Sequence, residues 1–237
     1  MTYDITPPIT PKLAVWPGDT PLSREVLNDM ARGDNITLST LRATTHLGAH
    51  ADGPNHYGKD ASAIDKRSLD YYLGRCQVIR VGVARATRIT PKMLPPKVSR
   101  EVPAVGGSHL ASRAAASAQG SGAPGERAIH LKPRVLFATG TFPNPQKWNS
   151  DFAALSVELV DFLHERGVIT VGIDTPSVDL FESKDLSAHK AMLRHDMSIL
   201  EGLVLKDVPE GIYELIALPL RLVGFDASPV RAVLRTV

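Results

Sequence analysis

The segment between residues 134 and 174 limits the folds open to this chain more than any other. It begins with the apolar, β-rich run 135–138 and ends with a second such run at 168–174, and each run predicts a β-strand. Between them, Ser156 is a suitable N-cap for a helix that Gly167 would end. A strand, a helix and a strand joined by short turns form a βαβ unit with parallel strands. We therefore expect an α/β fold.

Other parts of the chain carry similar signals. Further strands are predicted at residues 35–42, 76–83, 213–222 and 230–237, and the run 76–83 is expected to be central in the sheet. Ser187 predicts the N-cap of a second helix that starts at about residue 188.

Length and charge restrict the class of protein. The chain has 237 residues, 43% of them hydrophobic, which is enough for one sizeable α/β domain, so residues 1–237 are expected to form a single domain. Its 27 basic and 25 acidic residues give a net charge of +2, and no basic run is interleaved with aromatic residues as in a nucleic-acid groove. We expect a small-molecule partner and no nucleic acid.

Cysteine usage and hydropathy predict a cytoplasmic protein without membrane contact. Cys76 is the single cysteine, so no intramolecular disulfide can form, and we expect it to be a small buried residue. The first twenty residues lack a basic start followed by an apolar run, and no stretch approaches about 18 apolar residues.

Residues 95–133 interrupt the pattern of apolar runs. Their central part consists mostly of Ala, Gly and Ser and has no apolar period, so it cannot bury enough surface to offset the entropy lost on ordering. We predict a flexible surface insertion there, which makes His109 and His130 poor candidates for a site.

The sequence His-Leu-Gly-Ala-His-Ala-Asp-Gly-Pro-Asn-His at residues 46–56 carries the strongest chemical signal. It places three imidazoles and one carboxylate, which are ligands for borderline divalent metals, beside residues that prevent a regular helix. Its spacing differs from that of a zinc finger and from His-Glu-x-x-His on a helix. We interpret it as a metal-binding catalytic loop that follows a strand.

Local geometry supports this interpretation. If the backbone is extended around Ala51, His50 and Asp52 project to the same side, because side chains two residues apart share a face. Gly48 can adopt positive φ and fold the chain so that His46 joins them. Pro54 then stiffens the exit and directs His56 from another angle.

Candidates outside this loop have weaker local signals. Glu201 interrupts an apolar run, where it either pairs with a cation or faces water at an edge. His189 lies in the first turn of the second predicted helix, where a neutral, metal-bound imidazole suits the helix dipole. Asp174 and Asp179 follow a strand and could orient a ligand histidine or act as turn or cap residues. Trp16 could pack in the core or form an aromatic wall at a substrate pocket.

Three segments together resemble the bacterial kynurenine formamidases of the metal-dependent cyclase-like superfamily. They are residues 46–56, residues 172–189, and Ile-Leu-Glu-Gly-Leu at residues 199–203. The first is typical of the superfamily, and the other two point to the formamidases. The likeness covers nearly the whole chain except residues 95–133. The chain departs at Ala49, where the superfamily usually has threonine, but no ligand is lost by this change.

The resemblance implies a fold and a ligand set. The fold would be a swivelling β/β/α type with a mixed sheet and flanking helices, acting as a homodimer. Each subunit would hold two divalent ions, most simply zinc, although these ligands accept other metals. His46, His50 and Asp52 match the ligands of one ion and His189 matches a ligand of the other. Asp52 and Glu201 match the carboxylates that serve both ions.

The resemblance also implies a reaction, the hydrolysis of N-formyl-L-kynurenine to L-kynurenine and formate in tryptophan degradation by the kynurenine route. Water activated between the metals would attack the formyl carbon. His56 would be the acid/base residue, and Trp16 would stack on the aryl ring of the substrate.

Two alternatives use the same ligands. A related hydrolase of another aryl amide or lactam, such as an isatin hydrolase, would differ only in the lining of its pocket. A non-catalytic metal-binding protein would hold metal without turnover, and His56 would then have no role. A serine hydrolase is disfavoured because the sequence has no Gly-x-Ser-x-Gly elbow.

Overall fold

The computed structural model of the chain describes residues 1–96 and 131–237. Most of the insertion predicted at residues 95–133, with His109 and His130, lies outside the described residues.

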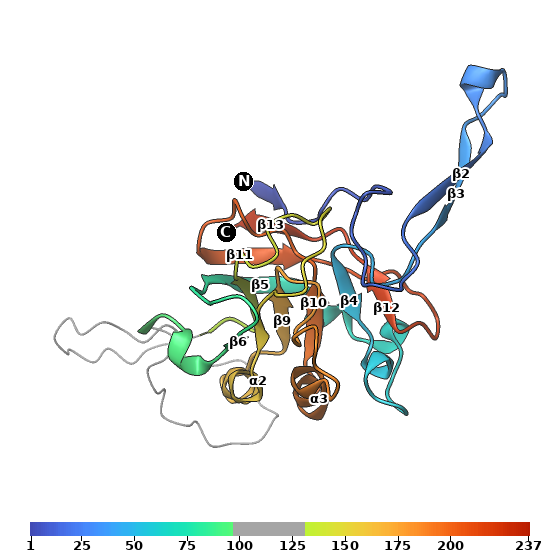
Figure 1. Cartoon of the computed structure of the whole chain (residues 1–237). Helices are drawn as coiled ribbons and strands as arrows, with labels where there is room; N and C mark the ends of the chain where they lie inside the picture. Colours follow the sequence, from blue (N-terminus) through green and yellow to red (C-terminus); the bar gives the residue numbers. More distant parts are fainter. Residues whose placement is uncertain (97–130) are drawn as a thin grey trace, which may run out of the picture.

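A nine-stranded mixed sheet forms the centre of the fold (Figure 1). Its strands in chain order are β1 (Thr2–Asp4), β4 (His50–Asp52), β5 (Leu73–Arg80), β7 (Arg134–Ala138), β9 (Thr170–Ile173), β10 (Ser198–Glu201), β11 (Gly211–Ile216), β12 (Ala227–Pro229) and β13 (Val233–Thr236). Across the sheet the order is β1, β13, β11, β5, β7, β9, β10, β4, β12. Strands β5, β7, β9 and β10 run parallel, whereas the other neighbouring pairs are antiparallel. This curled mixed sheet, flanked by helices, confirms the expected single-domain α/β fold.

Shorter elements surround the sheet. Two small sheets pair β2 (Ser23–Asn28) with β3 (Leu38–Arg42) and β6 (Arg88–Ile89) with β8 (Ala154–Leu155). The described residues contain the α-helices α2 (Val157–His164) and α3 (Ser187–Arg194), and the 3-10 helices η1 (Met30–Arg32), η2 (Pro54–His56), η3 (Ile64–Lys66), η4 (Leu69–Tyr71) and η5 (Pro91–Met93). No helix in this described part is long and apolar enough to span a bilayer.

The predicted βαβ unit is present as β7, α2 and β9. Strands β7 and β9 pair in parallel, and α2 connects them. The Ser156 hydroxyl caps α2 by accepting a hydrogen bond of 3.1 Å from the Leu159 N–H. Gly167 adopts a φ of +76° where the chain leaves the helix.

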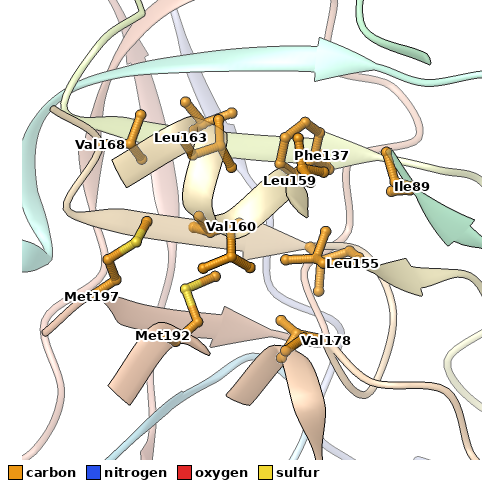
Figure 2. Close-up of a cluster of buried hydrophobic side chains, with 14 of the residues drawn as sticks. Ile89, Phe137, Leu155, Leu159, Val160, Leu163, Val168, Val178, Met192 and Met197 are labelled. Atoms are coloured by element: carbon orange, nitrogen blue, oxygen red, sulfur yellow. The ribbon is translucent and has the colours of Figure 1, made fainter. Parts of the chain in front are cut away.

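The sheet is covered on both faces at β7, which explains why this strand is buried along its whole length and is apolar from Val135 to Ala138. Val135 and Phe137 contribute to the core beneath α2 and α3, while Leu136 and Ala138 contribute to the core on the opposite face. Figure 2 shows the first core, in which Leu159, Val160 and Leu163 of α2 lie with Phe137 and Met192. The parallel strands are thus held from two sides, and their ends are fixed positions for a site.

Several predicted boundaries are corrected by the structure. β3 begins at Leu38, later than expected, and it belongs to the separate β2–β3 ribbon. The strand predicted at 76–83 is β5, which starts at Leu73 and ends at Arg80, and those predicted at 213–222 and 230–237 are shorter. Ser187 is not the N-cap of α3, because Leu186 takes this position with a φ of +48° and no side-chain hydrogen bond.

The β2–β3 ribbon projects away from the rest of the molecule (Figure 1). Nearly all of its residues are exposed, including Leu27 at 50%, Leu38 at 46% and Leu41 at 68%. Thr44 closes its base, donating a backbone hydrogen bond of 2.9 Å to the Thr20 carbonyl. An isolated two-stranded ribbon of this kind is only marginally stable in water.

Candidate metal centre and catalytic site

The register between two central strands places the first pair of functional side chains together. In the antiparallel pairing of β4 with β10, His50 lies directly opposite Glu201. Directly opposite residues have Cβ atoms about 5 Å apart, so their side chains meet on one face of the sheet. His50 Nε2 is 3.3 Å from Glu201 Oε2, and both residues are buried. Glu201 therefore does not face water, which removes the edge alternative.

Asp52 joins this pair because it lies two residues after His50 on the same short strand. Its Oδ1 is 3.5 Å from His50 Nε2 and 3.3 Å from His46 Nδ1. Its Oδ2 faces the other way and is 3.5 Å from His189 Nε2. Gly48 has a φ of +61°, as expected for the turn that brings His46 back to the cluster.

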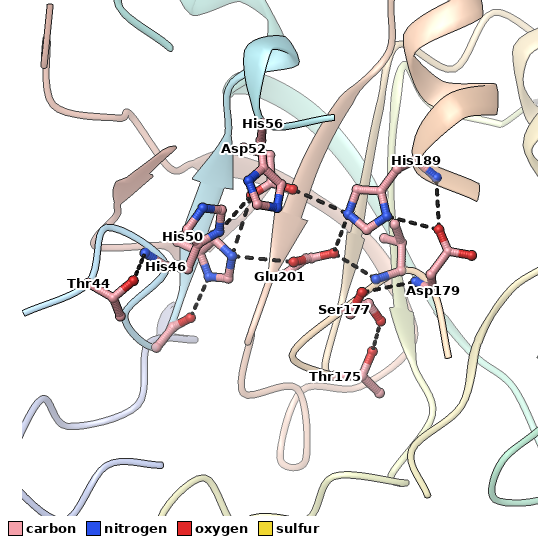
Figure 3. Close-up of polar contacts among 12 residues, drawn as sticks. Thr44, His46, His50, Asp52, His56, Thr175, Ser177, Asp179, His189 and Glu201 are labelled. Atoms are coloured by element: carbon pink, nitrogen blue, oxygen red, sulfur yellow. Dashed lines mark hydrogen bonds and ion pairs between the residues drawn. The ribbon is translucent and has the colours of Figure 1, made fainter. Parts of the chain in front are cut away.

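His189 reaches the cluster from the first turn of α3. Its Nε2 is 3.5 Å from Glu201 Oε1 (Figure 3). Asp179 holds this end of the helix: its Oδ1 accepts the Ala188 N–H at 3.2 Å, and its Oδ2 accepts the His189 N–H at 3.1 Å. This distant carboxylate replaces the cap expected from Ser187. Asp179 also pairs with Arg88, whose Nη1 lies 2.8 Å from Oδ1.

In His46, His50 and His189, the ring nitrogen that points away from the cluster faces a hydrogen-bond acceptor. His50 Nδ1 lies 2.9 Å from the Gly48 carbonyl, and His189 Nδ1 lies 2.9 Å from Asp179 Oδ2. His46 Nε2 lies 3.1 Å from Asp226 Oδ2. An acceptor on one nitrogen of a neutral imidazole leaves the other nitrogen as a lone-pair donor to a metal. The free nitrogens all face Asp52 or Glu201.

The electrostatics of the cluster are those of buried carboxylates among imidazoles. Burial raises the pKa of Asp52, but His189 and His46 outweigh it and hold that pKa well below its ordinary value. Burial lowers the pKa of His46, but the Asp52 carboxylate raises it to about 9. Burial also lowers the pKa of His189, but hydrogen bonds to Asp179 and Asp52 outweigh it and raise that pKa well above its ordinary value. Protons thus occupy these rings where no metal does, and metal binding would displace them.

The cluster fits divalent metal ions. In the described part of the chain, His50 Nε2 and both carboxylate oxygens of Asp52 are buried without a hydrogen-bond partner, and such atoms call for an ion or water. Tetrahedral zinc with ligands at about 2.0–2.1 Å separates its ligand atoms by roughly 3.3 Å, close to the spacings described above. Among the described residues, three groups of donor atoms are compact enough to hold an ion. Two of them are largely buried, His46 with His50 and Asp52, and Asp52 with His189 and Glu201, whereas the third, His46 with His56 and Asp226, is more exposed.

His56 lies at the edge of this cluster, on η2. Its ring centroid is 4.2 Å from that of His46 and 6.2 Å from that of His189. Its side chain is 36% exposed, and its Nδ1 is 3.7 Å from Asp226 Oδ2. Burial lowers the pKa of His56, so its imidazole is neutral near pH 7 and can accept a proton.

A cavity of about 600 Å³ opens over the cluster. His46, His50, His56, His189 and Glu201 all line it. The aromatic residues Trp16, Phe142 and Trp148 also line the cavity. The Trp16 ring packs against Trp148 and Phe181, with ring centroids 5.3 and 5.1 Å apart. Trp16 therefore packs among aromatic side chains and also lines the cavity.

The sequence-based predictions missed Asp226, which contacts the cluster, and most of the aromatic wall of the cavity. Asp226 has no local motif, and it approaches His46 across 180 positions of sequence. Phe142 and Trp148 line the cavity from a loop for which no function was predicted. Asp174 lines the cavity too, but its carboxylate accepts the backbone N–H groups of Thr139 and Gly140, as a turn residue would.

Comparisons with known proteins agree with this architecture. The Cyclase family model matches residues 3–180. A structure described as a potential metal-dependent hydrolase with cyclase activity covers 99% of this chain and 96% of its own, at 24% identity and a TM-score of 0.74. A predicted metal-dependent hydrolase from Bacillus stearothermophilus covers 99% and 97%, at 24% identity and a TM-score of 0.72. Isatin hydrolase A from Labrenzia aggregata, bound to benzyl benzoate, covers 99% and 93%, at 19% identity and a TM-score of 0.72. These three structures share the fold of this chain.

Proposed function

The chain belongs to the Cyclase family, and on that premise we propose that it is a metal-dependent hydrolase that converts N-formyl-L-kynurenine to L-kynurenine and formate. One observation carries the proposal: a cavity walled by Trp16, Phe142 and Trp148 is also lined by His50, His189 and Glu201 of the metal-fitting cluster. An aryl formamide has the two parts that such a cavity requires, a flat ring and a polar carbonyl group.

Two divalent ions, most simply zinc, would be held by His46, His50 and Asp52 on one side and by Asp52, His189 and Glu201 on the other. Bound ions of this kind bring the pKa of water close to neutrality and polarise a carbonyl oxygen. Asp52 and Glu201 each offer one oxygen to either side, which suits carboxylates that serve both ions.

His56 would move the proton during hydrolysis. Its Nδ1 is directed toward Asp226, which leaves Nε2 as the nitrogen available to a substrate. As water adds to the formyl carbon, His56 Nε2 takes a proton from it. The same nitrogen returns that proton to the aryl nitrogen when the C–N bond breaks, so that the amine leaves neutral together with formic acid, which releases its proton to solvent and becomes formate at neutral pH.

Trp16 would bind the aryl ring of the substrate. Its indole packs against Trp148 and Phe181 and therefore loses little further freedom when a ligand stacks on it. Stacking there orients the ring, and with it the formamide group, with respect to the histidines.

The test is to follow formylkynurenine hydrolysis by four preparations: metal-loaded protein, chelated protein, His56→Ala, and His195→Ala. His195 caps the far end of α3 and pairs with Asp161, so it is a matched histidine control outside the cavity. We expect turnover by the metal-loaded protein and by His195→Ala only, with metal retained in His56→Ala. Undiminished turnover after verified metal removal would contradict the proposal.

A second candidate is hydrolysis of a cyclic aryl amide, which is supported by the likeness to isatin hydrolases. The ligands would be the same and only the shape of the pocket would differ. Assays of formylkynurenine and isatin with one preparation separate the two, because the true substrate has the larger kcat/KM. A protein that binds metal tightly but hydrolyses neither would fit a non-catalytic role.

We also propose that the chain forms a homodimer through the β2–β3 ribbon. The ribbon exposes Leu27, Leu38 and Leu41 and has no packing partner among the described residues of its own chain. Burial of these side chains against a second copy would remove apolar surface from water at about 25 cal/mol per Å². The mass of the protein in solution tests this proposal.

A further inference from the structure

Asp226 is a charged residue that lines the cavity and has no role in the proposed function. It precedes β12, at the edge of the sheet beside β4. Its Oδ2 is 3.1 Å from His46 Nε2 and 3.7 Å from His56 Nδ1. A single carboxylate oxygen therefore faces one histidine of the metal-fitting cluster and the histidine proposed as acid/base.

The Asp226 side chain is itself held in place. Its Oδ1 accepts a hydrogen bond of 3.2 Å from the Thr45 hydroxyl, next to His46 in sequence. Its backbone carbonyl accepts the Gly53 N–H at 2.7 Å, which ties the segment to the start of η2 independently of the side chain.

We propose that Asp226 is a positioning residue for both imidazoles. It fixes His46 with Nδ1 toward Asp52, and it directs His56 so that Nε2 remains free. For His46 the arrangement parallels that of Asp179 behind His189, and a carboxylate behind a ligand histidine fixes the ring and strengthens its basicity. The inference rests on the proposed function for its catalytic part, whereas its effect on metal binding is independent of the substrate.

The parallel with Asp179 supplies a matched pair of variants. Asp226→Asn should weaken binding of the ion proposed at His46, His50 and Asp52. Asp179→Asn should weaken binding of the ion proposed at His189 and Glu201. Loss of such an outer partner typically lowers metal affinity about 10–100-fold. Both variants keep the size of the side chain, and the backbone bond from Gly53 to Asp226 is retained in the first.

The experiment is a stepwise chelator titration of the zinc-loaded wild type, Asp226→Asn, Asp179→Asn and the double variant, with visible spectra of the cobalt-substituted proteins. We expect each single variant to lower the zinc affinity at a different step of the titration by about 10–100-fold. The double variant should lower the affinity at both steps. Asp226→Asn should also lower kcat with little change in KM, because the substrate ring is bound elsewhere.

The outcomes separate the possible failures. Wild-type affinity at both steps in Asp226→Asn, or weakening of the same step by both variants, overturns the positioning role. So does equal weakening of both steps together with a large fall in melting temperature, since that indicates a role in folding. If formylkynurenine is not hydrolysed by the wild type, the proposed function fails while the metal titration still decides the role of Asp226 toward His46.

Discussion

Replacing Gly202 by alanine tests how the fold supports the site without touching any of the proposed ligands. Gly202 follows Glu201 and has a φ of +66°. A Cβ at this position would lie 2.2 Å from the Gly48 carbonyl oxygen and 2.8 Å from its carbon, where ordinary contact begins at 3.4 Å. That same carbonyl oxygen accepts the hydrogen bond that orients His50.

Two costs follow from this geometry. An alanine in the left-handed region costs about 1–2 kcal/mol, and forced displacement in a packed region costs about 1–3 kcal/mol. We therefore expect a loss of about 2–5 kcal/mol in the free energy of unfolding, which for a chain of this size lowers Tm by about 2–4 °C per kcal/mol. A shifted Gly48 carbonyl should also turn the His50 ring and weaken metal binding about tenfold or more.

The assay is thermal unfolding of metal-free protein, followed by metal titration, with Gly167→Ala as the control. Gly167 has a φ of +76°, but a Cβ there would meet nothing within 4 Å, so that variant isolates the backbone cost. We expect Gly202→Ala to be less stable than Gly167→Ala by about 1–3 kcal/mol, and only Gly202→Ala to lose metal affinity. Equal stability and equal metal affinity in the two variants would refute the reasoning.

Three further perturbations have defined expectations. Chelation should lower Tm reversibly, because a ligand at about a thousand times its Kd stabilises the folded state by roughly 4 kcal/mol; an unchanged Tm in calorimetry would show that metal is not linked to folding. Burial raises the pKa of the Cys76 thiol to about 12, so mass spectrometry should find no alkylation of folded protein at pH 8, and rapid labelling would contradict this. Leu41→Glu should halve the mass measured by light scattering if the β2–β3 ribbon makes the dimer, whereas Leu69→Glu, at another exposed leucine, should not; a Leu41→Glu protein of wild-type mass would exclude this interface.

The features that could be predicted from sequence depend on neighbours along the chain. The alternation of side chains in an extended segment correctly placed His50 and Asp52 on one side, although β4 has only three residues. The βαβ unit was predicted from two apolar runs with a helix between them, whose ends are marked by Ser156 and Gly167. Each of these signals lies within a few residues of the feature that it predicts.

The features that could not be predicted depend on contacts between distant segments. Asp226 meets His46 only because β12 pairs with β4, and no local pattern indicates that pairing. The N-terminal cap of α3 was wrongly assigned to Ser187. The acceptor for the N–H groups of the first turn of α3 is Asp179, in the preceding loop. The sequence left open whether Glu201 faces water at an edge or is buried with a partner. The register between β10 and β4, which places Glu201 opposite His50, decides this.

The most direct test of the account is the metal content of the wild type and of Asp52→Asn after zinc loading and gel filtration. Asp52 presents one oxygen to His46 and His50 and the other to His189, so both of the proposed ions would depend on it. The account predicts two zinc ions per chain in the wild type and loss of both in the variant. A wild type that holds no zinc, or an Asp52→Asn protein that holds as much as the wild type, would contradict it.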